Sequence, residues 1–317
     1  MSLTSEQQAI RSTAIGGSEI AAVVGLNPWM RPIDVWERKV GVAPTTNTGH
    51  TRRGQYLESG LLEWYRDELI ARRGNTVMVE RGRTMRHPTA ARVVATPDGL
   101  VYDGKTLDRV VEIKSPGWRT QEHWGEPGTD QIPLYYVPQV TWEMAVAGAP
   151  RADVWVLMGD ESALYTVDYD AALFGELADA AVRFWRDHVE TKRPPPPDGS
   201  DSYSEHLARR FPRPERAELL TATLEDESLA SEYREAREAS KRAELQEKEL
   251  RQRLETRIGE AEGLTGAGWK ILYRAQKGRA VVDAKAIAAE APDLVAKHTR
   301  EGAPFRVFRP TFAKETT

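Results

Sequence analysis

The sequence of 317 residues contains no cysteine. Disulfide bonds, thiol nucleophiles, cysteine-ligated zinc sites and iron–sulfur clusters are therefore excluded, and a metal ion would have to be bound by oxygen or imidazole ligands. Six histidines are present, but none has the spacing of a metal-ligand motif. We assign the histidines no function.

Long apolar runs and an excess of basic charge are also missing. No segment approaches the ~20 apolar residues of a membrane-spanning helix, and Met1–Arg11 is polar and lacks the apolar core of a signal peptide. We therefore expect a protein that stays in the cytoplasm and has no membrane partner. The 44 Lys and Arg residues are balanced by 48 Asp and Glu, a formal charge of −4. A nucleic-acid partner would thus require a local basic patch.

Composition divides the chain into three parts. Residues 1–193 are rich in Trp, Gly and short β-prone runs and are expected to form one domain. Four consecutive prolines from Pro194 favour a stiff spacer, so residues 194–225 are interpreted as a linker and surface segment. Residues 226–317 are expected to form a charged helical arm and a small α+β tail.

The third part begins with a long helix over Asp226–Glu260. Its apolar stripe is thin, which favours an arm packed on the body over a dimerising coiled coil. Trp269–Arg274 alternates like a strand with two basic side chains on one face, and Asp283–Glu290 and Phe305–Phe308 are expected to add a helix and a final strand.

The first part interleaves short helical and strand patterns, which predicts a mixed α/β core. Helices are expected at Ser18–Val24, Ile33–Arg38, Tyr56–Leu69, Val140–Ala147 and Ala171–Val189, and strands at Arg92–Ala95, Arg109–Lys114, Val154–Met158 and Leu164–Val167.

The strongest chemical signal is Asp98, in a Pro-Asp-Gly turn, followed by Glu112 and Lys114 on a strand. Alternation along the strand places Glu112 and Lys114 on one face, and Asp98 can lie beside Glu112 if the two strands pair. Two clustered carboxylates suit a hard divalent cation, and the lysine can orient or deprotonate a water molecule or stabilise developing negative charge. The alternative is an exposed hairpin with a solvated Glu–Lys pair.

Two further polar residues lie near this pattern. Glu58 falls on the apolar face of its helix, in line with Leu62 and Tyr65. It can either pair with Arg52 or Arg53 or serve as another metal ligand. Gln139 stands at the head of the helix over Val140–Ala147 and can contact DNA or water near the metal, or simply be a polar cap residue.

Five blocks in order resemble the YqaJ-like viral recombinase family, which is related to the phage lambda exonuclease within the PD-(D/E)xK nuclease superfamily. The blocks are Ile15–Ala22 with Asn27-Pro28-Trp29, Gly54–Glu58, Pro97-Asp98-Gly99, Glu112-Ile113-Lys114 and Tyr136–Gln139. The resemblance implies a restriction-endonuclease-like core with a mixed central sheet flanked by helices. It also implies a metal-dependent exonuclease that degrades one strand of linear duplex DNA from the 5′ end and leaves 3′ overhangs for a single-strand annealing protein.

The resemblance also implies roles for individual residues. Asp98 and Glu112 match the metal ligands, the backbone carbonyl of Ile113 a further ligand, and Lys114 the catalytic lysine. Glu58 and Gln139 match the helix carboxylate and the glutamine after the catalytic strand. The implied cofactor is Mg²⁺, with Mn²⁺ as a substitute, as one or two ions, and related exonucleases form rings around DNA.

Arg11 and Ser18 stand seven residues apart, as do the family's arginine and serine that hold the 5′-phosphate. Ser18 can cap the helix that follows, whose N-terminus favours an anion, and Arg11 can add a bidentate contact. The alternative is that Ser18 only caps the helix and Arg11 is solvated.

Basic and aromatic residues complete the candidates for DNA contacts. The arginines in question are Arg52, Arg53, Arg72, Arg73, Arg81, Arg83 and Arg86, and the tail adds Lys270, Arg274, Lys277 and Arg279. Trp118, Trp124 and Trp142 can stack on bases, although a place in the buried core is favoured. Two other functions stay open, a non-catalytic DNA-binding or assembly protein on a nuclease fold and a structure-specific endonuclease.

Overall fold

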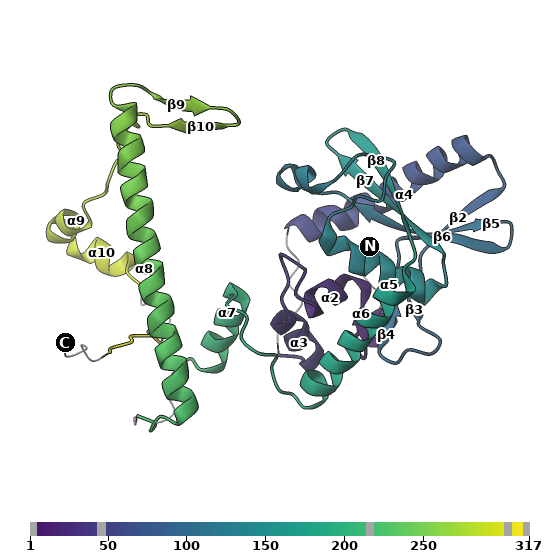
Figure 1. The fold of residues 1–317 in the computed structure, drawn as a ribbon, viewed down its shortest axis with the longest axis horizontal. Coiled ribbons are helices and arrows are strands. Elements are labelled where there is room, and N and C mark those ends of the chain that lie inside the picture. Colours follow the sequence, from purple (N-terminus) through teal and green to yellow (C-terminus); the bar gives the residue numbers. More distant parts are fainter. Residues whose placement is uncertain (1–4, 43–48, 214–218, 301–305, 313–317) are drawn as a thin grey trace. The chain divides into compact units, whose positions relative to one another are not determined.

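The computed structural model describes residues 5–42, 49–213, 219–300 and 306–312 (Figure 1). The chain forms two compact units, Met1–Phe211 and Pro212–Thr317, which are described separately. Within the described ranges no helix has both the length and the hydrophobicity that crossing a membrane would require.

The first unit is built on a five-stranded mixed sheet with strand order β2-β5-β6-β7-β8 (Figure 1). The strands are β2 (Val77–Arg81), β5 (Gly99–Asp103), β6 (Thr106–Lys114), β7 (Arg151–Met158) and β8 (Glu161–Asp168). The pair β6 and β7 is parallel, whereas the other neighbours are antiparallel. A parallel pair needs a long crossover, and here it contains helix α5 (Val137–Ala147) and the short 3₁₀ turns η1 (Trp118–His123) and η2 (Leu134–Tyr136).

Alternation along β6 separates two hydrophobic clusters. Val111 and Ile113 pack with Leu62 and Tyr65 of helix α4 (Gly49–Arg73). Val110 packs in another cluster with residues of α5. Glu112 shares the alternation of Val110, so it lies toward α5, and the predicted mixed α/β core is confirmed.

A third cluster surrounds a small sheet with strand order β1-β4-β3. Its strands are β1 (Ile15–Gly16), β4 (Val93–Ala95) and β3 (Met85–Arg86). The helices of this region are α1 (Ser5–Ser12), α2 (Gly17–Val23), α3 (Pro32–Val40) and α6 (Ala171–Phe184), which continues as a π-helical turn over Trp185–Glu190. The buried Trp36 and Trp142 belong to this cluster.

Helix α7 (Asp201–Arg210) extends the first unit past the prolines. Glu37 of α3 accepts a hydrogen bond of 2.7 Å from Arg209 and lies 2.7 Å from His206 Nδ1. Although burial raises the pKa of Glu37, hydrogen bonds from Arg209 and His206 lower it below its ordinary value. The structure thus divides the chain after Phe211, whereas the sequence prediction ended the first domain at residue 193 and treated residues 194–225 as a linker.

The second unit consists of a long exposed helix and smaller elements around it. They are α8 (Leu224–Ile258), β9 (Gly263–Gly266), β10 (Trp269–Leu272), α9 (Ala284–Glu290) and α10 (Pro292–His298). Thr223 caps α8 by accepting a hydrogen bond from the N–H of Asp226. The expected strand at Phe305–Phe308 is wrong for its described part, because Arg306 to Phe308 are irregular; Phe305 lies outside the described residues. Instead, the Phe308 ring lies against Tyr233 of α8, with ring centroids 5.4 Å apart.

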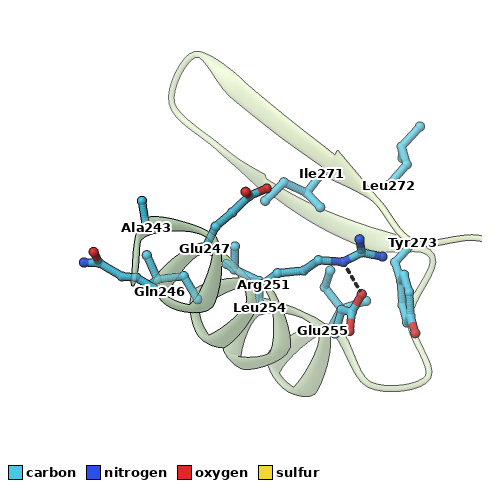
Figure 2. A pocket seen from close by; sticks show the side chains of 11 residues that line it. Ala243, Gln246, Glu247, Arg251, Leu254, Glu255, Ile271, Leu272 and Tyr273 are labelled. Carbon is cyan, nitrogen blue, oxygen red and sulfur yellow. Dashed lines mark hydrogen bonds and ion pairs between the residues drawn. The ribbon is translucent and has the colours of Figure 1, made fainter. Parts of the chain in front are cut away.

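The β9–β10 hairpin and the last turns of α8 enclose an open cavity of about 620 Å³ (Figure 2). Leu250 and Leu254 of the helix and Ile271 of the hairpin line it, and an ion pair between Arg251 and Glu255 lies at its edge. The expected long helix is present, and it packs on the hairpin through a few apolar side chains. The expected strand Trp269–Arg274 ends at Leu272, so Lys270 lies on it, whereas Arg274 lies beyond its end and pairs with Glu262.

Candidate active site

Asp98 and Glu112 are brought together by the pairing of β5 with β6. The Pro97-Asp98-Gly99 turn leads into β5, and the N–H of Asp98 donates to the carbonyl of Val111 over 3.1 Å. Asp98 Oδ2 in turn accepts a hydrogen bond of 2.7 Å from the N–H of Ile113. The expected placement of Asp98 next to the Glu112-Ile113-Lys114 segment is thus what the structure shows.

Gly99 allows the close approach of α4 to this turn. A Cβ atom at Gly99 would lie 2.8 Å from Leu62 Cδ1 and 3.2 Å from Val111 Cβ, closer than van der Waals contact allows. The glycine of the turn therefore lets the helix that carries Glu58 pack against the strand pair that carries Asp98 and Glu112.

Glu112, Lys114 and Gln139 form one hydrogen-bonded cluster. Lys114 Nζ donates to Glu112 Oε1 over 2.5 Å and to Gln139 Oε1 over 3.1 Å. Gln139 Nε2 donates to Glu112 Oε1 over 2.6 Å. Because the amide oxygen faces the ammonium and the amide nitrogen faces the carboxylate, Gln139 links both members of the Glu-x-Lys pair rather than acting only as a polar cap residue.

The buried charged groups of the cluster shift one another's pKa values. Burial raises the pKa of the Asp98 carboxyl well above its ordinary value, and the charges of Glu112 and Glu58 raise it further. Although burial lowers the pKa of the Lys114 ammonium, Glu112 outweighs this effect and the net pKa lies above its ordinary value. Lys114 is therefore a fixed positive charge at neutral pH, which favours charge stabilisation over proton abstraction among the roles considered for it.

Glu58 lies at the edge of this cluster. Its negative charge raises the pKa of Asp98, and its carboxylate forms an ion pair of 3.1 Å with Arg81 of β2. The sequence pattern suggests Arg52 or Arg53 as the ion-pair partner of Glu58. The ion pair in the structure is formed with Arg81 instead.

The carboxylates of the cluster fit a hard divalent cation. Among the described residues, no group of three His, Asp or Glu side chains has the arrangement of a complete metal site. Asp98 and Glu112 nevertheless each keep one oxygen, Oδ1 and Oε2, to which no hydrogen bond from a described residue is assigned. Mg²⁺ is commonly held by one or two carboxylates, with water and substrate phosphate completing its coordination. The donor set therefore suits such an ion, with the Ile113 carbonyl as the further predicted ligand.

Arg11 and Ser18 are in contact. Arg11 donates to Ser18 Oγ over 2.9 Å, and Ser18 is exposed. The expectation that Ser18 caps its helix is wrong, because Gly16 is the N-cap and Ser18 is the second residue of α2. The segment is held instead by Glu19, which accepts hydrogen bonds from Gly16 N–H over 2.9 Å and from Lys39 over 2.7 Å.

The sequence patterns assigned no role to two residues that touch the cluster, Tyr136 and Glu143. Lys114 Nζ lies 4.6 Å from the centre of the Tyr136 ring, and Glu143 accepts a hydrogen bond of 3.0 Å from Gln139. Burial raises the pKa of Glu143 well above its ordinary value, and its Oε2 is buried without a partner among the described residues. Glu143 follows Gln139 by one helical turn, and this i,i+4 spacing was the available signal.

The other candidates for DNA contacts are less distinctive. Trp124 and Trp142 are buried, as favoured, and the side chain of Trp118 lies outside the described residues. Ion pairs with acidic side chains involve Arg72, Arg73, Arg81, Arg83 and Arg274. Since exposed ion pairs contribute only ~0–1 kcal/mol, these arginines can still exchange partners with phosphate groups.

Fold and site together define the first unit as a mixed α/β domain with an aspartate at the start of one strand and a Glu-x-Lys pair on the next. Residues 6–150 match the family model of the YqaJ-like viral recombinase domain. The resemblance predicted from the motifs is confirmed over this stretch.

A curated relative and several solved structures are similar to the chain. The uncharacterized protein YqaJ of Bacillus subtilis (strain 168) is 26% identical over 298 residues, which cover 92% of this chain and 89% of that protein. The alkaline exonuclease LHK-Exo from Laribacter hongkongensis is 23% identical, with a TM-score of 0.46 over 66% of this chain and 100% of that one. A phage related exonuclease from Haemophilus somnus 129PT is 10% identical, with a TM-score of 0.40 over 56% of this chain and 96% of that one.

Proposed function

We propose that the first unit is a Mg²⁺-dependent deoxyribonuclease that degrades one strand of linear double-stranded DNA from 5′ to 3′ and leaves 3′ overhangs. The observation that carries the proposal is the contact of Asp98 with the Glu112-Ile113-Lys114 strand, together with the link from Gln139 to both Glu112 and Lys114. The match to a viral recombinase domain over residues 6–150 supports a nuclease of phage-type recombination.

In this mechanism Asp98 and Glu112 hold the cation and Lys114 faces the scissile phosphate. When bound, Mg²⁺ supplies Lewis-acid stabilisation of the phosphoryl oxygens and activation of the attacking water. The Lys114 ammonium stabilises the negative charge that develops on the phosphate, because hydrogen bonds to Glu112 and Gln139 already position it. Gln139 keeps Lys114 and Glu112 in one arrangement, so little reorganisation is needed during the reaction.

In this proposal, binding of the 5′ end of the strand makes the cutting directional. Arg11 and Ser18 are close enough to bind one phosphate together, and the contact between them is exposed on the Ser18 side. A 5′-phosphate bound there would fix the strand end, so that geometry rather than base sequence decides which bond is cut. A single-strand annealing protein would receive the overhang, and a ring of several copies would keep the enzyme on the duplex.

The proposal is tested by incubating linear and covalently closed circular duplex with the protein and Mg²⁺. We expect the linear DNA to be degraded and the circle to be spared. Asp98→Ala and Glu112→Ala should abolish degradation while the protein stays folded, and EDTA should stop the wild type. Glu176→Ala, which removes an exposed carboxylate on α6, is the matched control and should be as active as the wild type.

Other outcomes would select a different function. Cutting of the circle would point to an endonuclease. Binding of DNA ends with no cleavage in Mg²⁺ or Mn²⁺ would point to a non-catalytic DNA-binding protein on a nuclease fold.

A further inference from the structure

An aromatic pair, the exposed Trp29 and the half-buried Tyr135, lies next to the candidate catalytic centre. Trp29 is 61% exposed, and its ring contacts Tyr135 edge-on with centroids 5.0 Å apart. Leu134, beside Tyr135 in the chain, is 65% exposed. Large apolar side chains that gather on the surface of a soluble protein indicate a binding site more often than isolated ones do.

Trp29 is held in its exposed position by the backbone around it. Asn27 Oδ1 accepts hydrogen bonds from the N–H groups of Trp29, over 2.8 Å, and of Met30, over 2.9 Å. The N–H groups of Leu26 and Asn27 both donate to the carbonyl of Ala21 in α2. The backbone of the Asn27-Pro28-Trp29 segment is thus held by hydrogen bonds, which reduces the ordering needed when a ligand binds.

Ring contacts through Tyr136 connect the aromatic pair to Lys114. Tyr135 and Tyr136 have ring centroids 4.6 Å apart, and Lys114 Nζ lies 4.6 Å from the Tyr136 ring. Successive nucleotides of a stacked strand lie about 3.4 Å apart. The contacts that lead from Lys114 through Tyr136 and Tyr135 to Trp29 therefore span the length of no more than about four nucleotides. His123 Nδ1 lies 3.4 Å from the Tyr135 hydroxyl and adds a contact at the far side of that ring.

We propose that Trp29 and Tyr135 form a stacking site for an unpaired nucleobase of the DNA strand that enters the candidate catalytic centre. Base–aromatic stacking tolerates every sequence because each base has a flat π face, which suits an enzyme that cuts without reading sequence. The site would also favour opening of the last base pairs, since a stacked base no longer pairs with its partner strand. This inference rests on the proposed nuclease function.

The test measures an unpaired base at a DNA end directly. Duplexes carry 2-aminopurine in a short unpaired 5′ segment and are titrated with full-length protein in Ca²⁺, which is expected to support binding better than turnover. Binding of the wild type should change the 2-aminopurine fluorescence. Trp29→Ala should lose most of this change and bind about 5- to 150-fold more weakly, the equivalent of ~1–3 kcal/mol for one stacked base.

Conservative and control variants separate stacking from a structural role. Trp29→Phe keeps an aromatic face and should retain most of the signal. Leu26→Ala removes exposed apolar surface from the same turn without removing a ring, and should behave as the wild type. Should Trp29→Ala fail to fold, Tyr135→Leu keeps apolar volume without a ring and must show the same loss.

The inference is overturned if Trp29→Ala, or Tyr135→Leu in its place, matches the wild type in affinity and fluorescence. A variant that binds DNA normally but no longer binds a single-strand annealing protein would also overturn it, because the pair would then contact a protein. Failure of the proposed function is a separate result: wild-type protein would not degrade linear duplex in Mg²⁺, whatever the fluorescence shows.

Discussion

Gln139 Nε2 donates a hydrogen bond of 2.6 Å to Glu112 Oε1, across 27 positions of sequence. The same amide accepts from Lys114 through its oxygen and donates to Glu143 through its nitrogen. Helix α5 therefore fixes the positions of the carboxylate and the ammonium on β6.

Lys114→Ala should lower the single-turnover cleavage rate by a factor on the order of 10² or more, as expected for a positioned electrostatic group. The melting temperature should change little in the presence of Mg²⁺, because the cation then balances the charge of Glu112. Lys105→Ala, an exposed lysine in the turn between β5 and β6, is the control and should keep the wild-type rate. A collapsed melting temperature with an unchanged rate would make Lys114 half of a structural ion pair.

Glu143→Gln should change how stability depends on pH. The pKa of Glu143 is raised in the folded protein above its ordinary value of 4.5, so the folded state binds this proton more tightly than the unfolded state does. Wild-type stability should thus fall relative to Glu143→Gln as the pH rises above about 4.5. Urea denaturation of both proteins at several pH values without metal measures this difference. A constant difference between pH 4 and pH 8 would contradict the raised pKa.

Arg11→Ala should remove a preference for phosphorylated ends. Wild-type protein should degrade 5′-phosphorylated linear duplex faster than 5′-hydroxyl duplex, on the order of 10- to 100-fold, as charge-assisted hydrogen bonds to a phosphate would give. The variant should lose this ratio more than it loses total activity. Arg183→Ala, an exposed arginine on α6, should keep the ratio. Equal wild-type rates on both ends would rule out the phosphate pocket.

A chain that ends at Phe211 should keep metal-dependent cleavage and lose DNA affinity or processivity. The Asp98 and Glu112 cluster is formed by side chains of the first unit, and the second unit carries exposed basic residues such as Lys270 and Arg274. Gel-shift and single-turnover assays on the folded truncation measure the two properties. Complete loss of cleavage in a truncation with native circular dichroism would show that the second unit completes the active site.

A shorter truncation at Gly199 serves as a comparison. It removes α7, so Glu37 would lose its contacts with Arg209 and His206, and the cluster around Trp36 would lose Tyr203. This truncation should melt at a lower temperature than the one ending at Phe211, because a hydrogen-bonded ion pair and buried apolar contacts are lost together. Equal melting temperatures would mean that α7 does not stabilise the first unit.

Much of the fold could be predicted because local patterns repeat with the period of the element. Leu62, Tyr65 and Leu69 follow helical spacing on α4 and are all buried, as the pattern predicts. The alternation in β6 placed Glu112 and Lys114 on one face, where they now contact each other. The strand expected at Phe305–Phe308 is wrong for its described residues 306–308, where Phe308 packs on Tyr233 of α8 instead.

The site was predicted less completely, because it depends on contacts between distant segments. Nothing in the sequence near Glu58 points to Arg81, which is 23 positions away and reaches it only once β2 lies beside α4. In the same way, Gly16 rather than Ser18 caps α2, since Glu19 and Lys39 fix the preceding backbone.

The sequence by itself determined which residues can do chemistry here. The Pro-Asp-Gly turn, the Glu-x-Lys strand and the glutamine at the start of α5 follow from residue types and periodicity, which are local properties. Only the tertiary structure decided how they meet. The raised pKa values of Asp98 and Glu143, the orientation of the Gln139 amide and the position of the Trp29 ring beside Tyr135 all arise from packing. Burial and through-space charge act between residues far apart in the chain, so no local pattern records them.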